Sequence, residues 1–192
     1  MLRKSLFALM FASILATAVF ADTLAIGSKL EDFTLKDPKG KAYKVSELKG
    51  EHGTLFVFLS AQCPVVSLYN DRINALASEY AAKGIPFVGL YSNDTECLNW
   101  VKHHSSTTYK FKTLVDEGHV IADRFGAEYT PEIYYFDASD KLVYHGAIDD
   151  DRYGREITRN HLKIALDEQL AGKAITRNDI QAFGCSIKRE AE

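Results

Sequence analysis

The chain has 192 residues, 46% of them hydrophobic, which is enough for one domain with an adequate core. Its formal net charge is −3, and it has no basic patch or lysine run, so nucleic acid is not an expected partner. Its three cysteines are too few for a disulfide scaffold, so the fold must rest on its core.

Residues 1–21 have the features of a secretory signal peptide. Arg3 and Lys4 form a charged start, and the apolar run of residues 6–20 follows. This run is shorter than the ~20 residues of a membrane-spanning helix, so we expect cleavage before Asp22 and no stable membrane insertion. The mature domain would then be residues 22–192, in a periplasmic or secreted location. Loss of the two cations would change the net charge from −3 to −5.

Residues 26–50 predict a hairpin-like start around the turn at residues 37–40, followed by one helical turn. A buried strand is expected next. Thr54–Leu59 is a short apolar run rich in β-forming residues, and Gly53 precedes it.

Cys63-Pro64 follows, at the junction between this strand and a long amphipathic helix that ends near Gly84. The helix shows apolar residues at helical spacing, at positions 65, 66, 69, 73, 76, 77 and 80. Pro64 suits the first helical position. The unpaired N–H groups of a helix N-terminus carry partial positive charge, which favours a thiolate. The pattern therefore favours a reactive thiol at Cys63 over an ordinary buried cysteine.

A second buried strand is predicted at residues 86–91. The resulting β-α-β unit should form a parallel pair with a right-handed crossover, so both strands end at the same edge of the sheet. Cys63 and the polar turn at residues 92–95 should therefore be neighbours.

A short helix is expected from this turn to about residue 104, with Leu98 and Val101 facing the core. A polar loop should occupy residues 105–109. A strand is then favoured at residues 111–115, and Asp116 is expected to cap a further helix.

The second half of the chain predicts two antiparallel strands at residues 133–136 and 142–144. A loop with three consecutive aspartates comes next, and a last helix follows Thr158. The tail from residue 174 onward is mostly polar.

A β-α-β half followed by an antiparallel β-β-α half resembles the thioredoxin-like fold. This is an α/β fold with a central mixed sheet flanked by helices, here with an N-terminal extension and a C-terminal tail. Its specific marks are Cys63-Pro64 at the first helix and Thr130-Pro131 before the antiparallel pair. The resemblance implies a cis peptide at Thr130-Pro131, lying against the cysteine, so that both residues position the sulfur and present backbone to a substrate.

The wider pattern is similar to the redoxin branch, the AhpC/TSA-type or peroxiredoxin-like proteins. The segments that carry this likeness are Ile26-Gly27, residues 32–35, residues 58–60, Cys63-Pro64, Gly126-Ala127, residues 130–132 and residues 146–150. The closing segment, residues 184–188, is similar to the tail of one exported or environmental subgroup.

Two departures from these families bear on the activity. A thioredoxin-type C-x-x-C is excluded because Val66 occupies its second cysteine position. The peroxiredoxin motif P-x-x-x-T/S-x-x-C is half present, since Ser60 supplies the hydroxyl but Phe56 replaces the proline. For an arginine that would hold a peroxide, Arg124 and Arg152 are the candidates.

A redox cycle at Cys63 needs a second thiol. Cys185 follows Gly184 in the tail and could attack a mixed disulfide or a sulfenic acid on Cys63. It could also form a static disulfide or remain a spare thiol. Cys97, at the same sheet edge as Cys63, is the competing partner. The pairings 63–97, 63–185 and 97–185 therefore stay open.

Metal and cofactor sites have little support. Ser67 stands where a copper-binding C-x-x-x-C would need its second thiolate, so no metal site is expected. No flavin, nicotinamide or haem motif is present, and no cofactor is expected. Glu132 could act as a proton acceptor near the site, although a carboxylate on a surface strand is the simpler interpretation.

The sequence thus predicts an exported thiol-disulfide oxidoreductase. Cys63 would be the nucleophile, and Cys185, or failing that Cys97, the resolving thiol. Its partners would be a disulfide-bearing protein or a peroxide, and an external thiol that returns the electrons. The alternatives are a peroxiredoxin-like thiol peroxidase and a redox-inert binding or scaffold domain. The residues expected to support the site are Ser60, Pro64, Thr130, Pro131 and Glu132.

Overall fold

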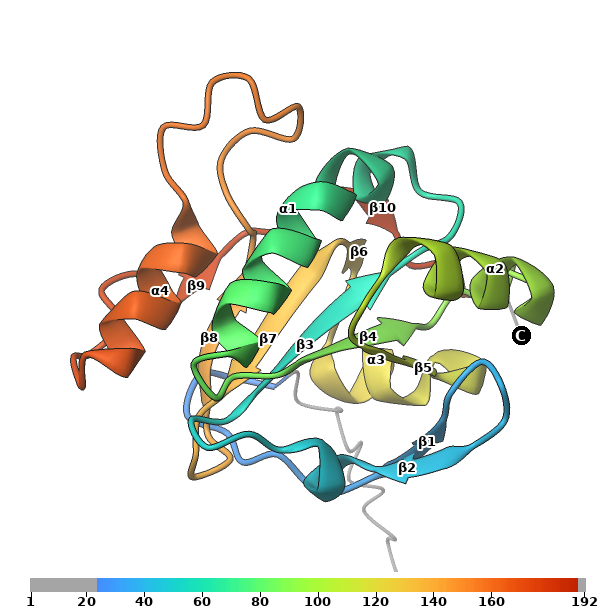
Figure 1. Ribbon diagram of the computed structural model, residues 1–192, viewed down its shortest axis with the longest axis horizontal. Coiled ribbons are helices and arrows are strands. Elements are labelled where there is room, and N and C mark those ends of the chain that lie inside the picture. Colours follow the sequence, from blue (N-terminus) through green and yellow to red (C-terminus); the bar gives the residue numbers. More distant parts are fainter. Residues whose placement is uncertain (1–23, 190–192) are drawn as a thin grey trace, which may run out of the picture.

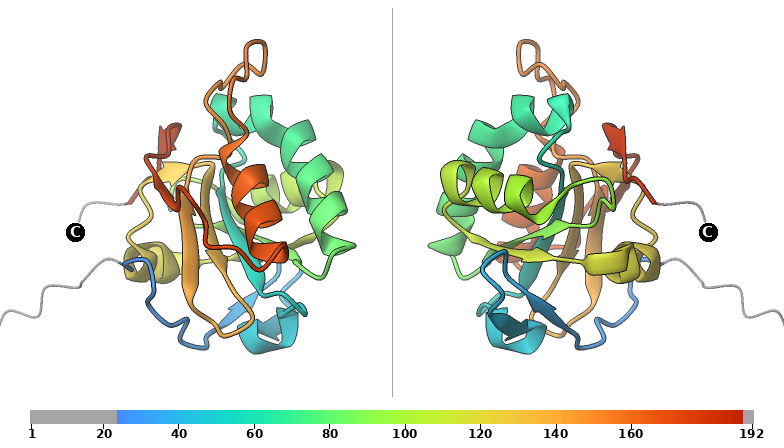
Figure 2. Two further views of the ribbon diagram at one scale, coloured as in Figure 1. Left: turned by 90° about the vertical axis from the view of Figure 1, so that its left-hand side faces the viewer. Right: turned by 90° about the vertical axis from the view of Figure 1, so that its right-hand side faces the viewer.

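The computed structural model describes residues 24–189, and the expected signal peptide lies outside this range. Within it a mixed sheet has helices on both faces, as Figures 1 and 2 show. The strand order is β2-β1-β5-β4-β3-β7-β8-β9. This is the thioredoxin-like fold expected from the sequence. No helix in the described part of the chain has the length and apolar character that crossing a membrane requires.

The elements follow one another in the order shown by the colours of Figure 1. The strands are β1 (Thr34–Lys36), β2 (Ala42–Lys44), β3 (Thr54–Leu59), β4 (Phe87–Tyr91), β5 (Lys112–Val115), β6 (Tyr129–Thr130), β7 (Glu132–Phe136), β8 (Leu142–Gly146), β9 (Asp179–Ile180) and β10 (Cys185–Ser186). The helices are η1 (Val45–Leu48), α1 (Pro64–Ala81), α2 (Leu98–Thr108), η2 (Glu117–His119), α3 (Val120–Phe125) and α4 (His161–Leu170).

Strand β3 is the centre of the sheet, and all six of its residues are buried. It pairs in parallel with β4 and antiparallel with β7. The parallel pair sets Leu59 opposite Tyr91, so both strands end at one edge, as predicted. The antiparallel pairing of β7 with β8 is confirmed as well.

Two hydrophobic layers lie on the two faces of this sheet. Because successive strand side chains point to opposite faces, Leu55, Val57 and Leu59 pack with α1, α2 and α4, whereas Phe56 and Phe58 pack with α3. Figure 2 shows α3 on one side of the sheet and α1 with α4 on the other. The second layer is rich in aromatic contacts centred on the ring of Phe125.

Helix α1 confirms the predicted amphipathic helix. Its buried face consists of residues at helical spacing: Val66, Tyr69, Ile73, Ala77 and Tyr80. Pro64 occupies the first turn, as its fixed φ and missing N–H favour.

Helix α2 differs from the prediction at both ends. Its N-cap is Cys97, and Leu98 is 55% exposed, so the expectation that Leu98 faces the core is wrong. Val101 is buried as expected. The helix runs on to Thr108, and the predicted loop at residues 105–109 is wrong. Two hydroxyls of this polar stretch, on Ser106 and Thr107, donate to the carbonyl of His103 within the helix itself.

Asp116 caps a helix, but the N–H groups that it binds are five and six residues further along the chain. Its carboxylate accepts hydrogen bonds of 2.9 Å from the N–H groups of Ile121 and Ala122. The segment between forms the separate turn η2, because Gly118 and His119 adopt positive φ values of 67° and 48°. The single predicted helix is therefore broken into η2 and α3.

The polar tail contributes two short strands to the β-sheets of the molecule. Strand β9 extends the main sheet beside β8, and β10 pairs antiparallel with β6. These two-residue strands, which the sequence did not predict, bring the end of the chain back to the sheet edge where β3 ends, as Figure 1 shows.

Candidate active site

Cys63 is the N-cap of α1, directly after β3, and is 2% exposed. Its Sγ accepts a hydrogen bond of 3.4 Å from the N–H of Val66. This is the junction that the sequence predicted. The same N–H would stabilise a thiolate formed there on reduction.

Cys63 is joined to Cys185 by a disulfide bond that spans 122 residues, with the two Cα atoms 5.9 Å apart. Cys97 is free and exposed. Of the three pairings that the sequence left open, the structure therefore contains 63–185.

The Thr130-Pro131 peptide is cis, as the resemblance implied. The sulfur of Cys63 lies 3.3 Å from the carbonyl oxygen of Thr130. A disulfide sulfur has no proton, so this is a contact in the oxidised form. After reduction the Cys63 thiol is placed to donate a hydrogen bond to that oxygen.

The tail strand β10 lies along the edge of β6, with Cys185 opposite Thr130 and Ser186 opposite Tyr129. Gly184 permits this approach, because a Cβ atom there would lie 2.0 Å from the oxygen of Thr130. Strand β10 therefore occupies the hydrogen-bonding edge of β6, directly before the cis peptide.

Glu96 is hydrogen-bonded to the loop between β3 and Cys63. Its carboxylate accepts a hydrogen bond from the hydroxyl of Ser60 and others from the N–H groups of Ala61 and Gln62, at 3.0 and 3.1 Å. Glu96 is 9% exposed. Sequence reasoning missed it. The available indication was its place just after the turn expected beside Cys63.

The turn after β4 is also hydrogen-bonded to the C-terminal tail. Asn93 donates from Nδ2 to Glu96 at 3.1 Å and accepts at Oδ1 from the N–H of Lys188 at 2.6 Å. The N–H of Asp94 donates to the carbonyl of Lys188 at 3.0 Å. The turn is thus hydrogen-bonded to the tail that carries Cys185 and, through Glu96, to the loop before Cys63.

Glu132 is 3% exposed, so the interpretation as a surface carboxylate is wrong. One oxygen accepts bonds of 2.8 Å from the N–H groups of Glu128 and Tyr129, and the other lies 2.7 Å from Nε2 of His145. The chain before Thr130 turns back onto this carboxylate and buries it. Glu132 therefore supports the backbone of β6.

His145 sits between two carboxylates, Glu132 and Asp179. Burial alone would lower the pKa of His145. The hydrogen bonds and negative charges of Glu132 and Asp179 outweigh burial and raise the pKa above its usual value.

The two candidate arginines pack on aromatic rings. The guanidinium of Arg124 lies 5.1 Å from the ring centre of Phe33, and that of Arg152 lies 5.6 Å from the ring centre of Phe183. Across residues 24–189, no group of three or more His, Cys, Asp or Glu side chains has an arrangement that could hold a metal ion.

Comparison with known proteins gives a family. The model of the AhpC/TSA family matches residues 26–145, more than half of the chain. A curated relative, the thiol-disulfide oxidoreductase ResA of Bacillus thuringiensis (strain Al Hakam), is 27% identical over 128 residues. The match covers 65% of this chain and 72% of the relative.

Several solved structures resemble this one. A hypothetical protein from Sinorhizobium meliloti 1021 is 31% identical with a TM-score of 0.80, covering 89% of this chain and 98% of that one. An uncharacterized conserved protein from Geobacillus kaustophilus is 29% identical with a TM-score of 0.81, covering 89% and 95%. A putative thiol:disulfide interchange protein DsbE from Chlorobium tepidum shares the fold, at 21% identity and a TM-score of 0.59 over 78% and 98%. The family match and the thioredoxin-like fold together show that this protein belongs to the AhpC/TSA family, with thiol-disulfide oxidoreductases among its relatives.

Proposed function

We propose that the protein is an exported thiol-disulfide oxidoreductase that cycles between a Cys63–Cys185 disulfide and the two thiols. The observation that carries the proposal is the position of this bond. It joins the N-cap of α1 to a tail strand beside the cis Thr130-Pro131 peptide.

The cycle can be written with all atoms and electrons in balance. The thiolate of reduced Cys63 attacks a substrate disulfide, forms a mixed disulfide, and releases one substrate thiolate. The thiolate of Cys185 then attacks the Cys63 sulfur and releases the second substrate thiol. This step forms the Cys63–Cys185 bond. An external dithiol reduces that bond and is itself oxidised to a disulfide.

The supporting residues have separate roles in this proposal. Pro64 begins α1 and fixes the turn that presents the sulfur. Thr130 and Pro131 place a backbone carbonyl against Cys63. Ser60 and Glu132 are positioning residues, since each holds backbone that adjoins a cysteine and neither is hydrogen-bonded to a sulfur atom.

The proposed location is the periplasm or the exterior of the cell. The leader pattern of residues 1–21 supports it, because it has the charge and length of a secretory signal.

A peroxiredoxin-like thiol peroxidase is the second candidate. Ser60 stands three residues before Cys63, as the peroxiredoxin motif requires. Its hydroxyl, however, donates to Glu96. This arrangement gives the hydroxyl a positioning role and favours disulfide exchange.

The test combines thiol titration with trapping. Reduced protein is alkylated across a pH series and mapped by mass spectrometry. We expect the Cys63 midpoint to fall below the value of about 8.5 for a free thiol. The variant Cys185→Ser should accumulate a mixed disulfide at Cys63 with a disulfide-bonded peptide, whereas Cys97→Ser should keep the full cycle.

Three results would contradict the proposal. A cycle driven by hydrogen peroxide much faster than by the peptide disulfide would indicate a peroxidase. A Cys63–Cys185 bond that mild dithiols do not open would indicate a redox-inert scaffold. Loss of cycling in Cys97→Ser would assign resolution to Cys97.

A further inference from the structure

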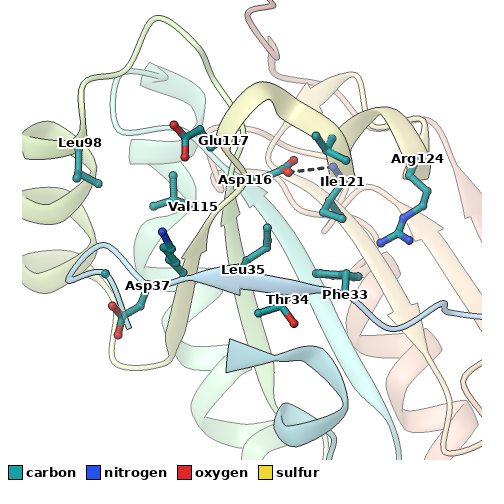
Figure 3. Close-up of a pocket in the computed structure, with 13 residues that line it drawn as sticks. Phe33, Thr34, Leu35, Asp37, Leu98, Val115, Asp116, Glu117, Ile121 and Arg124 are labelled. Carbon is teal, nitrogen blue, oxygen red and sulfur yellow. Dashed lines mark hydrogen bonds between the residues drawn. The ribbon is translucent and has the colours of Figure 1, made fainter. Parts of the chain in front are cut away.

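A cavity of about 550 Å³ lies away from the cysteines, among β1, the first residue of α2 and the η2–α3 segment (Figure 3). Its volume is in the range of roughly 300–1,000 Å³ that is usual for small-molecule sites. Leu35, Val115 and Ile121 provide an apolar lining. None of the residues assigned above to the redox site lines it, so a ligand here would bind outside the proposed redox site.

Two large apolar side chains at this cavity are exposed to solvent. Leu98 is 55% exposed and Val120 is 62% exposed, and both line the cavity. They lie on different helices, α2 and α3. An apolar ligand body seated between them would remove this surface from water, which is favourable in proportion to the area covered.

A cation with spare hydrogen-bonding capacity lies at one end of the cavity. Arg124 lines it, and Figure 3 shows its guanidinium directed toward Phe33. Its Nε is buried and has no hydrogen-bond partner among residues 24–189. Its Nη1 reaches only 3.4 Å from a carboxylate oxygen of Glu31, which is itself 79% exposed.

This arrangement selects a ligand chemistry. The Arg124 side chain is 32% exposed and its ion pair with Glu31 is long, and a carboxylate matches the planar fork of arginine with two parallel bonds. The cavity is also lined by Lys36 and by three carboxylates, of Asp37, Asp116 and Glu117. Figure 3 places Asp37 and Glu117 at the end opposite Arg124. That balance of charge disfavours a polyanion such as a phosphate ester.

We propose that this cavity binds a small organic monocarboxylate with an apolar body. The carboxylate pairs with Arg124. The apolar body lies on Leu35, Val115 and Ile121 and is covered at its sides by Leu98 and Val120.

The test is a titration of the protein, followed by amide NMR, with octanoate and 3-phenylpropionate as probes. We expect saturable shifts confined to β1, the start of α2 and the η2–α3 segment. Two matched probes without the carboxylate, 1-octanol and octylamine, separate the contributions of the head group and the body. Octanol should bind more weakly than octanoate, and octylamine more weakly still.

Variants locate the contact. Arg124→Gln should weaken octanoate binding by about tenfold or more, the effect expected for a lost charge-assisted hydrogen bond, and should leave octanol binding unchanged. Arg155→Gln, at an exposed arginine of the acidic loop, should change neither. Leu98→Ser should weaken octanoate and octanol alike. A dispersed amide spectrum for each variant confirms that it is folded.

Several outcomes would overturn the proposal. Shifts scattered over the whole surface would show only detergent-like association. Equal losses in Arg124→Gln and Arg155→Gln would remove the specific role of Arg124. Shifts of the same residues with protein concentration alone, together with a dimer by light scattering, would show that a second copy covers this cavity. Both redox outcomes of the preceding experiment are compatible with either result here.

Discussion

At the scale of single residues, the Glu96 carboxylate accepts three hydrogen bonds from the loop before Cys63. A variant Glu96→Ala would leave the Ser60 hydroxyl and the N–H of Ala61 without their acceptor, and the N–H of Gln62 would keep only the Ser60 oxygen, at 3.2 Å. We expect the free energy of unfolding to fall by about 1–3 kcal/mol, the usual effect of leaving buried donors unpaired. Chemical denaturation measures this change.

Hydrogen exchange adds a local measurement to the same variant. The amides of Ala61 and Gln62 should exchange faster in Glu96→Ala, while those of β7 should change only with global stability. Glu156→Ala, at an exposed carboxylate of the acidic loop, is the control and should change neither measurement. Unaltered exchange at Ala61 and Gln62 would show that Glu96 does not hold this loop.

The residues of the site were predictable where the chemistry depends on local chain order. The place of Cys63 at a helix start, the fit of Pro64 and the cis peptide at Thr130 all follow from neighbours in the sequence or from the resemblance. Glu96 was missed, and the burial of Glu132 was not expected, because a carboxylate in a polar turn or at a strand start is usually solvated. Both are buried here by chain segments that fold over them from elsewhere.

At the scale of elements, the docking of β10 depends on the missing side chain of Gly184. In Gly184→Ala the new Cβ would meet the Thr130 oxygen, so β10 must move away from β6 and separate the two cysteines. In glutathione buffers we expect the equilibrium constant for forming the Cys63–Cys185 bond to fall by about tenfold or more, since at least one hydrogen bond of the pairing is lost.

The matched control lies in the same strand. Ser186 is exposed, and its hydroxyl accepts a hydrogen bond from Lys188. Ser186→Ala should leave the equilibrium constant nearly unchanged. If Gly184→Ala behaves like Ser186→Ala, then the tail reaches Cys63 without the close approach to Thr130.

A helix or strand could be predicted when its own sequence contains a long periodic set of apolar residues. Strand β3 and helix α1 bury long periodic sets of apolar residues, so sequence periodicity found both. The end of α2 was missed because its Ser and Thr residues resemble a loop, whereas two of their hydroxyls bond within the helix. Strands β9 and β10 have two residues each and are defined by the strands they join.

At the scale of the whole molecule, the disulfide closes a loop of 122 residues. Cross-links stabilise proteins mainly by restricting the unfolded chain, and the loss of a native one typically costs about 2–5 kcal/mol. Cys185→Ser should therefore lower the unfolding free energy of the oxidised protein by that amount. Cys97→Ser should have little effect, because Cys97 is exposed and unbonded. Equal stability of Cys185→Ser and the oxidised wild type would contradict this account.

The stability of the fold should also depend on the protonation of His145. Its pKa is raised above the usual 6.5, so the protonated ring binds Glu132 and Asp179 more strongly in the folded state. This stabilisation is fully present below about pH 6.5 and is lost as the pH rises through the raised pKa.

The measurement is the difference in unfolding free energy between the wild type and His145→Gln. We expect this difference to be larger at about pH 5.5 than at about pH 8.5. Asn99→Gln, at an exposed position of α2 without a titratable group, should show no such trend. A difference that grows toward alkaline pH would mean that burial dominates and that His145 is neutral in the fold.

The distance along the chain between the bonded cysteines has a consequence for biosynthesis. During synthesis, Cys63 emerges long before Cys185, and Cys97 becomes available between them. An oxidase that acts on the emerging chain can therefore join Cys63 only to Cys97, which the finished molecule leaves free. The Cys63–Cys185 bond cannot form until the segment that carries Cys185 has emerged.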